Sequence, residues 1–597
     1  MIKILLFSNA FDDTFGGMEE HRKAFVLYFK GHSEYDLILL SNADNSYCIE
    51  INGEKVRFDN ISNLISHMQT FVCSEDVFFF NDFRWVNDME FLRKQFSNNK
   101  FIVRSGGNDI LRAPVYNDSV SLSVRQNKLV EIINGCVNCL IVNSDYSYIV
   151  NRDIGINPML MKKIRGGVDY REVYSLYKER TTNRTDFDAK YGTNGKKVIT
   201  LACRLVPFKG ILQFLQQIKP TFDSNAYRLL IIGNGPLLEE IRIALDKDFK
   251  DSYILIEGAN HATTMRYLSI SDVVINPSIY FKRYFGNEWF FHTETMGRTM
   301  IEAIALNIPI MATNVGGTSE LFFENPDENI GLLVDNYDLF ADKIQRIQFI
   351  HEFKDYASQY SWESIFEKYK LLFAGAGKRV FCFDLDGTIV DKNTDESSIC
   401  SILQEHQGDI VILNTARKSC DESIQFFENS GAEYLIYNNG CGILSKKSRC
   451  FVAPYVKSQS QFDDLDKVEL KFITCFGAEQ IERTHINCLS IEKDPRFVEF
   501  LEKECLDLTS IELIYGEHLI KVINKNMNKK QAMLYIIKDV FCNKLVVAGD
   551  ATNDIPFMQV GSCIYSAEEI AHLIGKPVIT FNKQESKTEL LRRIFNE

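Results

Sequence analysis

Two carboxylates two positions apart follow an apolar run in this 597-residue chain. Residues 379–383 read as a strand, and Asp384 and Asp386 come at its end, before a Gly-Thr turn. A parallel strand would present both side chains at the carboxyl edge of its sheet, where α/β proteins hold ligands. One carboxylate there can serve as a nucleophile and the other as an acid or base. The run begins well past the middle of the chain, so we expect a second chemistry upstream.

Three later elements supply further polar residues in the same part of the chain. One is a strand that ends in a hydroxyl residue, one a helix that starts with a lysine, and one a strand that ends in acidic residues. These residues are Thr415, Lys529, and Asp550 with Asp554. In this order, behind the first two carboxylates, they resemble the motifs of the haloacid-dehalogenase (HAD) phosphohydrolases.

The resemblance implies a role for each of these side chains. Asp384 would attack phosphorus and form an aspartyl-phosphate, and Asp386 would protonate the leaving oxygen and then activate water. Thr415 and Lys529 would hold the phosphoryl oxygens. Mg²⁺ prefers oxygen ligands and would be bound by carboxylates and one backbone carbonyl. Its implied ligands are Asp384, the carbonyl of Asp386, and Asp550, with Asp554 or Asn553 in support.

Four sites in the first 375 residues have the residue types that bind phosphates and sugars. Two are glycine turns after strands, which let backbone amides approach an anion. One is a pair of cations after a strand, suited to a diphosphate. One is a pair of glutamates eight positions apart at a loop-to-helix junction. The residues are Gly16 with Gly17, Gly233, Arg204 with Lys209, and Glu294 with Glu302 and Gly297 between them. Each site alone is also explained as a tight turn, a solvated basic loop or a helix cap.

Taken in order, the four sites resemble the retaining nucleotide-sugar glycosyltransferases of the GT-B fold, family 4 in particular. The resemblance spans residues 1–375 and includes the run Val315-Gly-Gly-Thr-Ser-Glu320 and a terminal helix near Trp362 that crosses back to the first domain. It implies a cleft between two Rossmann-like domains as the site. It also implies retention of anomeric configuration without a required metal.

The same resemblance assigns roles within that cleft. Arg204 and Lys209 would neutralise the donor diphosphate and the leaving nucleotide diphosphate. Glu302 would accept hydrogen bonds from the ribose hydroxyls, and Glu294 would contact the donor sugar. The remaining implied donor-binding residues are Gly16, Gly17, Gly233 and Gly297. Family members often carry a histidine after the fourth strand, whereas residues 80–85 of this chain have none.

The alternation of short β-branched or aromatic runs with longer helix-period segments predicts parallel sheets in an α/β fold. We expect two Rossmann-like domains, residues 1–170 and 171–376, followed by a HAD Rossmann-like domain at 377–597. That last domain would have a core at 377–440 and 526–597 and an α/β cap at 441–525. The polar stretch 177–186 reads as a surface connection, and the small residues 374–377 as an interdomain linker.

Composition narrows the function classes. The net charge of -13 argues against a nucleic-acid partner. The fifteen cysteines have no disulfide or zinc spacing, and residues 2–7 read as a first strand rather than a signal peptide. No apolar stretch reaches the length of a spanning helix. We expect a cytoplasmic protein without a transmembrane segment, and peripheral contact with a membrane stays open.

These observations favour a bifunctional enzyme. One half would transfer a sugar from a nucleotide-sugar donor to a sugar-phosphate acceptor, and the other would remove the phosphate. An alternative is a transferase for polysaccharides or lipid-linked glycans beside an independent HAD phosphatase or phosphomutase. A degenerate regulatory domain is a third interpretation. The aromatic segment 280–292 is either an acceptor platform or a packed surface loop.

Overall fold

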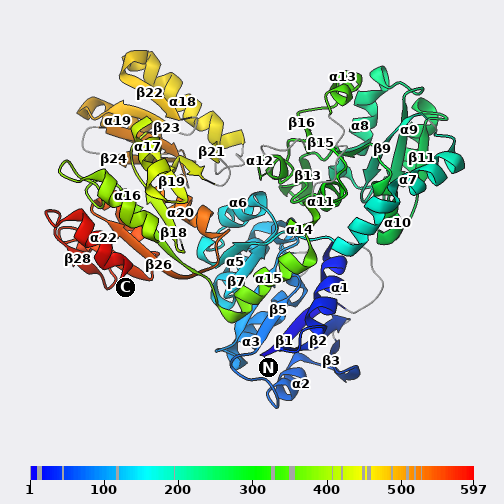
Figure 1. Cartoon of the computed structure of the whole chain (residues 1–597), viewed down its shortest axis with the longest axis horizontal. Helices are drawn as coiled ribbons and strands as arrows, with labels where there is room; N and C mark the ends of the chain where they lie inside the picture. Colours follow the sequence, from blue (N-terminus) through cyan, green and yellow to red (C-terminus); the bar gives the residue numbers. More distant parts are fainter. Residues whose placement is uncertain are drawn as a thin grey trace. The chain divides into compact units, whose positions relative to one another are not determined.

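The computed structural model describes residues 2–596, with the exception of 10–16, 44–45, 116–119, 194, 325–329, 348–355, 407, 419–420, 447–450, 453–458, 486–487, 506–507, 509, 516–518 and 526. Two compact units make up the chain, Met1–Phe373 and Ala374–Glu597. Both units are built on parallel sheets flanked by helices (Figure 1), so the predicted α/β class is confirmed.

The first sheet of unit 1 has the strand order β4-β3-β2-β1-β5-β6-β7-β8. Its strands from β2 across to β8 are parallel, and β3 and β4 form an antiparallel edge. Strands β5 and β7 are apolar and buried along their whole length, as is typical of parallel strands with both faces covered. Its strands are β1 (Ile2–Asn9), β2 (Tyr35–Ala43), β3 (Ser46–Ile51), β4 (Glu54–Phe58), β5 (Val77–Phe80), β6 (Lys100–Arg104), β7 (Cys139–Val142) and β8 (Met161–Lys163). Its helices are α1 (Gly17–Lys30), α2 (Ile61–Met68), α3 (Met89–Gln95), α4 (Asp109–Arg112), α5 (Leu122–Cys136) and α6 (Asp145–Asp153).

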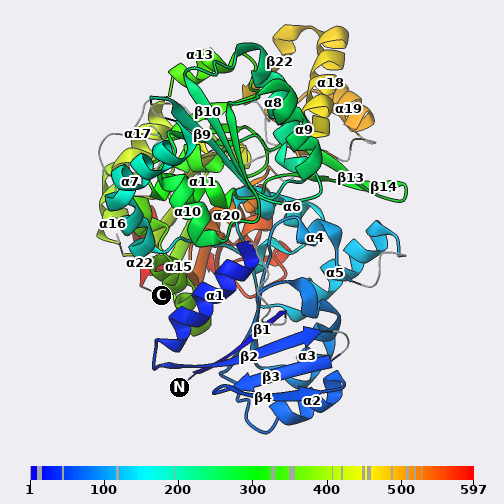
Figure 2. The same cartoon turned by 90° about the vertical axis from the view of Figure 1, so that its right-hand side faces the viewer.

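The second sheet of unit 1 is parallel throughout, in the order β11-β10-β9-β12-β15-β16. Its strands are β9 (Lys197–Ala202), β10 (Tyr227–Ile232), β11 (Tyr253–Ile256), β12 (Val273–Asn276), β15 (Ile310–Thr313) and β16 (Gly331–Val334). Its helices are α8 (Ile211–Ile218), α9 (Leu238–Asp248), α10 (His261–Ser269), α11 (Arg298–Ala305), α12 (Glu320–Glu324) and α13 (Phe340–Gln345). A separate antiparallel hairpin, β13 (Phe281–Phe285) with β14 (Glu288–His292), projects from this half (Figure 2).

Unit 1 ends in α14 (Tyr356–Gln359) and α15 (Trp362–Ala374), and α15 returns to the first sheet's helices. The Tyr369 hydroxyl lies 2.9 Å from His21 Nε2 on α1, and Lys100 Nζ donates to the Phe373 carbonyl at 2.8 Å. Phe366 packs against Phe25 with ring centroids 5.6 Å apart. Helix α15 therefore ties the end of the second half to the first half.

The polar stretch 177–186 is helical, so its prediction as a surface connection was wrong. It lies inside α7 (Tyr170–Tyr191), which begins after the Asp169 cap and ends at Gly192 in the left-handed conformation, φ 63°. The long charged side chains of this stretch are good helix formers. A helix that lies on the surface needs a narrow buried stripe, here Val173, Asn183 and Phe187.

Unit 2 contains an eight-stranded sheet in the order β21-β20-β19-β18-β17-β26-β27-β28. The six strands from β19 to β28 are parallel. The strands are β17 (Lys378–Asp384), β18 (Ile410–Asn414), β19 (Tyr434–Tyr437), β20 (Gly442–Ser445), β21 (Phe451–Val452), β26 (Cys542–Gly549), β27 (Cys563–Ala567) and β28 (Ile579–Phe581). The helices beside this sheet are α16 (Glu396–Glu405), α17 (Asp421–Ser430), α20 (Lys529–Ile537), α21 (Ile555–Met558) and α22 (Lys587–Phe595).

An antiparallel sheet is inserted between β21 and α20, in the order β22-β23-β25-β24. Two helices pack their apolar side chains, among them Phe472 and Leu501, on this sheet. The elements are α18 (Gln459–Phe476), β22 (Ile481–His485), β23 (Cys488–Glu492), α19 (Pro495–Cys505), β24 (Ile511–Tyr515) and β25 (Leu519–Asn524). Strands β20 and β21 fall within the predicted cap, 441–525, but pair antiparallel with the large sheet. The short turn at Asn438–Gly440 leads β20 back along β19, so the large sheet continues beyond residue 441 before the inserted sheet begins.

Among the described residues, no helix is both long enough and apolar enough to span a bilayer.

Candidate active sites

Three buried carboxylates meet at the carboxyl edge of the unit 2 sheet. Asp384 ends β17, and Asp550 follows β26, the strand that pairs with β17 in parallel. Asp554 lies one short turn further along the chain. One carboxylate oxygen of each residue lies within 4.8 Å of the others. Parallel neighbours bring their carboxyl ends together, so the topology itself concentrates this negative charge.

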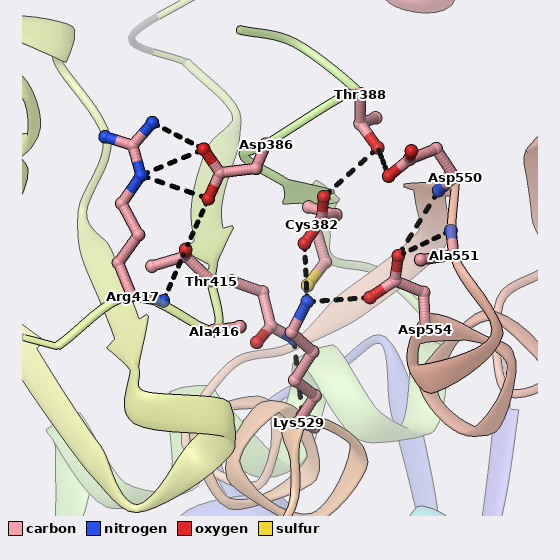
Figure 3. Close-up of polar contacts among 12 residues, drawn as sticks. Cys382, Asp386, Thr388, Thr415, Ala416, Arg417, Lys529, Asp550, Ala551 and Asp554 are labelled. Atoms are coloured by element: carbon pink, nitrogen blue, oxygen red, sulfur yellow. Dashed lines mark hydrogen bonds and ion pairs between the residues drawn. The ribbon is translucent and has the colours of Figure 1, made fainter. Parts of the chain in front are cut away.

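Lys529 balances part of that charge. Its Nζ donates to Asp384 Oδ1 at 2.5 Å. It also donates to Asp554 Oδ1 at 2.7 Å (Figure 3). Asn528 caps α20 and accepts from the Gln531 amide, which fixes the lysine at the first turn of the helix. Burial would lower the pKa of Lys529, but the two carboxylates outweigh burial and raise it. The ammonium therefore stays charged.

Asp384 is a buried acid whose pKa is shifted by its surroundings. Burial raises its pKa well above the usual value, Lys529 opposes that shift, and Asp554 adds to it. Thr388 Oγ1 lies 3.3 Å from Asp384 Oδ2 and 3.3 Å from Asp550 Oδ1. Because burial disfavours the ionised form, a further positive charge at the cluster would be needed to keep Asp384 ionised for attack on an electrophile.

Gly387 permits the close approach of Asp550. Its φ is +79°, and a Cβ at this position would lie 2.4 Å from Asp550 Oδ2. A side chain there would displace the carboxylate from the cluster and strain the backbone. The Gly-Thr turn after the second carboxylate is therefore a steric requirement of the cluster.

Asp386 lies beside this group and has different partners. Its Oδ2 accepts from Thr415 Oγ1 at 3.2 Å, and both its oxygens accept from Arg417 Nε, at 2.9 and 3.0 Å (Figure 3). The Arg417 NH2 group also donates to Asp386 Oδ1. The side chain of Asp386 is half exposed, whereas that of Asp384 is buried. The two carboxylates of the motif are thus placed in unlike surroundings, as two distinct roles require.

Arg417 is a site residue to which the sequence pattern assigned no role. It follows Thr415 by two positions, and this closeness to a predicted site residue was the signal that could have identified it. It also lines a groove of ≈ 540 Å³ beside α16 and α17, so its side chain has room to move.

We expect Arg417→Ala to lower kcat for phosphate release about tenfold, because the half-exposed Asp386 carboxylate loses the guanidinium hydrogen bonds that orient it. Arg417→Lys keeps the charge but not the two-pronged geometry and should restore activity in part. Initial rates with p-nitrophenyl phosphate measure the effect. Equal kcat values for wild type and Arg417→Ala would contradict the orienting role.

The carboxylate cluster has the donor set that a hard divalent cation prefers. Asp384, Asp550 and Asp554 are buried oxygen donors within reach of one ion. The three carry more negative charge than Lys529 neutralises, and Lys583 Nζ lies 2.9 Å from Asp550 Oδ2 at the rim. These residues fit Mg²⁺. The Asp386 side chain lies outside the three-carboxylate group, so three of the four predicted metal residues are brought together by their side chains.

A second charged site lies in unit 1, where the loop after β14 precedes α11. Lys209 Nζ donates to Glu294 Oε2, and Glu294 Oε1 accepts from the Gly297 amide at 3.1 Å. Burial would raise the pKa of Glu294, but Lys209 and the Gly297 amide lower it overall. For Lys209 the two effects have the opposite sign. Burial would lower its pKa, but Glu294 raises it above the usual value. Both groups are therefore charged.

The Val315-Gly-Gly run holds Glu294 in place through its backbone. The Gly317 amide donates to the Glu294 carbonyl at 3.0 Å. A Cβ on Gly316 would lie 2.0 Å from that carbonyl oxygen, and one on Gly317 would lie 2.0 Å from the Thr295 carbonyl oxygen. Side chains are excluded at both positions, so the glycines allow the loop to press against the glutamate.

Glu302 has partners of its own on α11 and α10. Its Oε1 accepts from Arg298 Nε at 2.8 Å and lies 3.0 Å from His261 Nε2. Burial would raise the pKa of Glu302, and Arg298 with His261 lowers it overall. Burial lowers the pKa of His261, but the bond to Glu302 raises it. Arg298 and His261 were not predicted; an arginine four positions before a glutamate was the signal for the first.

The other predicted residues of unit 1 are Gly16, Gly17, Arg204 and Gly233. Gly17 opens α1, and a Cβ there would lie 3.7 Å from Arg298 Cδ, so the first half reaches the α11 start. Gly233 lies where a Cβ would come 2.0 Å from the Cys203 carbonyl, next to Arg204. The Arg204 side chain is exposed and makes no hydrogen bond or ion pair with other described residues. Gly16 lies outside the described residues.

Similarity to known proteins is strongest in the second half of unit 1. Residues 183–361 match the family model described as "Glycosyl transferases group 1". Over 170 residues the chain is 28% identical to the GDP-mannose-dependent alpha-(1-6)-phosphatidylinositol monomannoside mannosyltransferase of Mycobacterium tuberculosis, covering 28% of this chain and 41% of that protein. The chain spans less than half of the length of the curated relatives that it matches.

Two solved structures are similar to parts of this chain at low sequence identity. Anabaena HepE, in complex with UDP, is similar with a TM-score of 0.46 and 14% identity, covering 63% of this chain and 100% of that one. The HAD subclass IIB sugar phosphatase BT4131 is similar with a TM-score of 0.29 and 12% identity, covering 36% of this chain and 99% of that one.

Proposed function

We propose that this chain is a bifunctional enzyme that transfers a sugar from a nucleotide-sugar donor to a phosphorylated acceptor and then hydrolyses the phosphate ester. The observation that carries the proposal is the buried Asp384–Lys529–Asp554 arrangement in a chain whose residues 183–361 match a glycosyltransferase family. Transfer would retain anomeric configuration.

In the transferase half, the charges around the start of α11 are arranged for a donor. Lys209 is paired with Glu294, and Arg204 is free among the described residues to meet a diphosphate. A diphosphate would compete with Glu294 for Lys209 and release the glutamate carboxylate toward the sugar hydroxyls. Glu302, held by Arg298, would accept from the ribose hydroxyls. No metal is required in this half, because the cations neutralise the leaving group.

In the phosphatase half, Asp384 would form a bond to phosphorus while the ester P–O bond breaks. Asp386 would give its proton to the leaving oxygen, and later take one from the water that cleaves the aspartyl-phosphate. Lys529 and Thr415 would donate hydrogen bonds to the phosphoryl oxygens. Mg²⁺ bound by Asp384, Asp550 and Asp554 would supply the positive charge that lets two anions approach.

Chelation should separate the two activities. EDTA is expected to abolish phosphate release from sugar phosphates and to leave nucleotide diphosphate release from a nucleotide sugar unchanged. Only the carboxylate cluster of unit 2 depends on a cation in this proposal, and added Mg²⁺ should restore its activity. Equal loss of both activities would mean that the transferase half also needs a metal.

Coupling is tested with purified full-length protein, UDP-glucose or GDP-mannose as donor, and a panel of sugar and polyol phosphates as acceptors. Release of nucleotide diphosphate followed by phosphate, both dependent on the acceptor, is expected. Release of the nucleotide without phosphate would overturn the coupled sequence.

A second candidate keeps both activities but uncouples them, with a polysaccharide or lipid-linked glycan as acceptor. It is favoured by the division of the chain into two compact units, each with one complete set of charged residues. A preference for long acceptors without phosphate would identify this case. Conversion of a sugar 6-phosphate to its 1-phosphate would instead identify a phosphomutase.

A further inference from the structure

The hairpin β13–β14 exposes an aromatic face. Because side chains alternate along a strand, the cross-strand pairs Lys282 with Phe291 and Tyr284 with Trp289 lie on one face. The exposed fractions are 61% for Tyr284, 43% for Trp289 and 41% for Phe291. The solvent face of an antiparallel hairpin is normally polar. This face holds three large aromatic rings and one lysine.

The opposite face anchors the hairpin to the rest of unit 1. Glu288 accepts from the backbone amides of Leu122 at 2.5 Å and Ser123 at 3.2 Å, at the N-terminus of α5. Phe285 lies under the Arg125 guanidinium, 5.1 Å from its centre, and His292 stacks on Phe208 with centroids 4.2 Å apart. These contacts fix which face is turned outward. The aromatic face is therefore held in the open rather than left exposed by a loose loop.

The exposed face is continuous with the site that holds Glu294. Tyr280, the residue before β13, contacts the Phe291 ring at 5.7 Å, and its hydroxyl accepts from the Gly316 amide at 3.0 Å. Gly317, the next residue, donates its amide to the Glu294 carbonyl. Strand β14 ends at His292, two residues before Glu294. A ligand that covers the aromatic face would reach the site around Glu294 from the end of the face where Tyr280 lies.

We propose that this face, formed by Tyr280, Tyr284, Trp289 and Phe291, binds a carbohydrate chain and delivers its end to Glu294. The inference rests on the transferase part of the proposed function and selects a glycan acceptor, as in the second candidate. Flat aromatic rings offer apolar faces to the C–H faces of sugar rings, and the phenol and indole groups offer hydrogen bonds at the edges. Lys282 lies 4.3 Å from the Trp289 ring centre and is the single cation of the face. An anionic membrane surface would instead favour several exposed cations.

The test compares full-length wild type with the double variant Tyr284→Ser/Trp289→Ser. The matched control is Phe91→Ser, an aromatic residue of α3 that is 58% exposed. Native gels containing dextran, α-mannan or soluble starch report binding, and sugar transfer to the same glycans is compared with donor hydrolysis. We expect wild type and Phe91→Ser to be retarded by at least one glycan. The double variant should bind that glycan about tenfold more weakly, as expected from the loss of two ring contacts.

Three results would overturn the assignment. The first is equal retardation of the double variant and wild type, and the second is no retardation of wild type by any of the three glycans. The third is pelleting with phosphatidylglycerol vesicles that the double variant loses while its glycan binding is unchanged, which would assign the face to a membrane. Donor hydrolysis separates this proposal from the proposed function. Wild type that binds glycan but consumes no nucleotide sugar would refute the transferase and leave the glycan surface standing.

Discussion

Replacing Asp384 with asparagine is expected to reduce phosphate release on the order of 10⁴-fold or more, the scale at which enzymes lose activity with their nucleophile. An amide cannot form the bond to phosphorus that a carboxylate forms. The Lys529 ammonium and the Thr415 hydroxyl stay in place, so binding of the phosphate ester should change much less than kcat. Phosphate release from p-nitrophenyl phosphate and from glucose 6-phosphate measures the loss.

The same variant should fold normally. The asparagine oxygen can still accept the Lys529 hydrogen bond, and Lys529 keeps its 2.7 Å contact with Asp554. Removing one of three mutually repelling buried carboxylates offsets the lost ion pair, so we expect a change in the free energy of unfolding of about 1 kcal/mol or less. A thermal melt checks this point.

Asp391→Asn is the matched control, since this carboxylate stands on the same β17–α16 connection but bonds to Thr394 and the Asn393 amide. It should retain phosphate release. Asp384→Asn should also retain nucleotide release from a nucleotide sugar. Residual phosphatase activity above a hundredth of wild type would assign the nucleophile to another residue.

Residues that follow strands could be predicted from the sequence, because a parallel sheet gathers them at one edge. Asp384 and Asp550 meet there, and Lys529, at the start of α20, reaches Asp384 as the motif order suggested. Partners that belong to no recognised motif could not be predicted. His261 comes from α10 to reach Glu302, and no spacing rule connects the two positions.

The glycines of the Val315-Gly-Gly run illustrate a second limit. In the sequence they were only part of the resemblance to the glycosyltransferases, with no role of their own. In the structure they press on the backbone of Glu294 and Thr295 at distances that admit no Cβ. The misassigned stretch 177–186 shows the converse: it has few apolar residues, yet its caps and helix-forming side chains suffice for a surface helix. Tertiary contact supplied the first fact, whereas the second followed from local capping and helix propensity that the polar composition obscured.

Replacing Glu294 with glutamine is expected to lower kcat for sugar transfer by about 10²–10³-fold, the usual cost of losing one preorganised electrostatic group. Glutamine can still accept from the Gly297 amide, so the loop should keep its shape. Its neutral amide leaves the buried Lys209 without its counter-charge and offers the donor sugar no carboxylate. The loss should therefore appear in kcat more than in KM for the donor.

Glu302→Gln provides the contrast within the same helix region. Its carboxylate is held by Arg298 and is assigned to the ribose, a part of the donor that does not react, so its loss should raise KM for the donor with a smaller effect on kcat. Glu239→Gln, at an exposed glutamate of α9, should leave both constants unchanged. Initial rates of nucleotide diphosphate release with UDP-glucose and with GDP-mannose give all four values for each variant. If Glu294→Gln changed KM alone, Glu294 would be a donor-binding residue without a part in the transfer step. The proposed exchange of Glu294 for the donor diphosphate at Lys209 would then have no catalytic consequence.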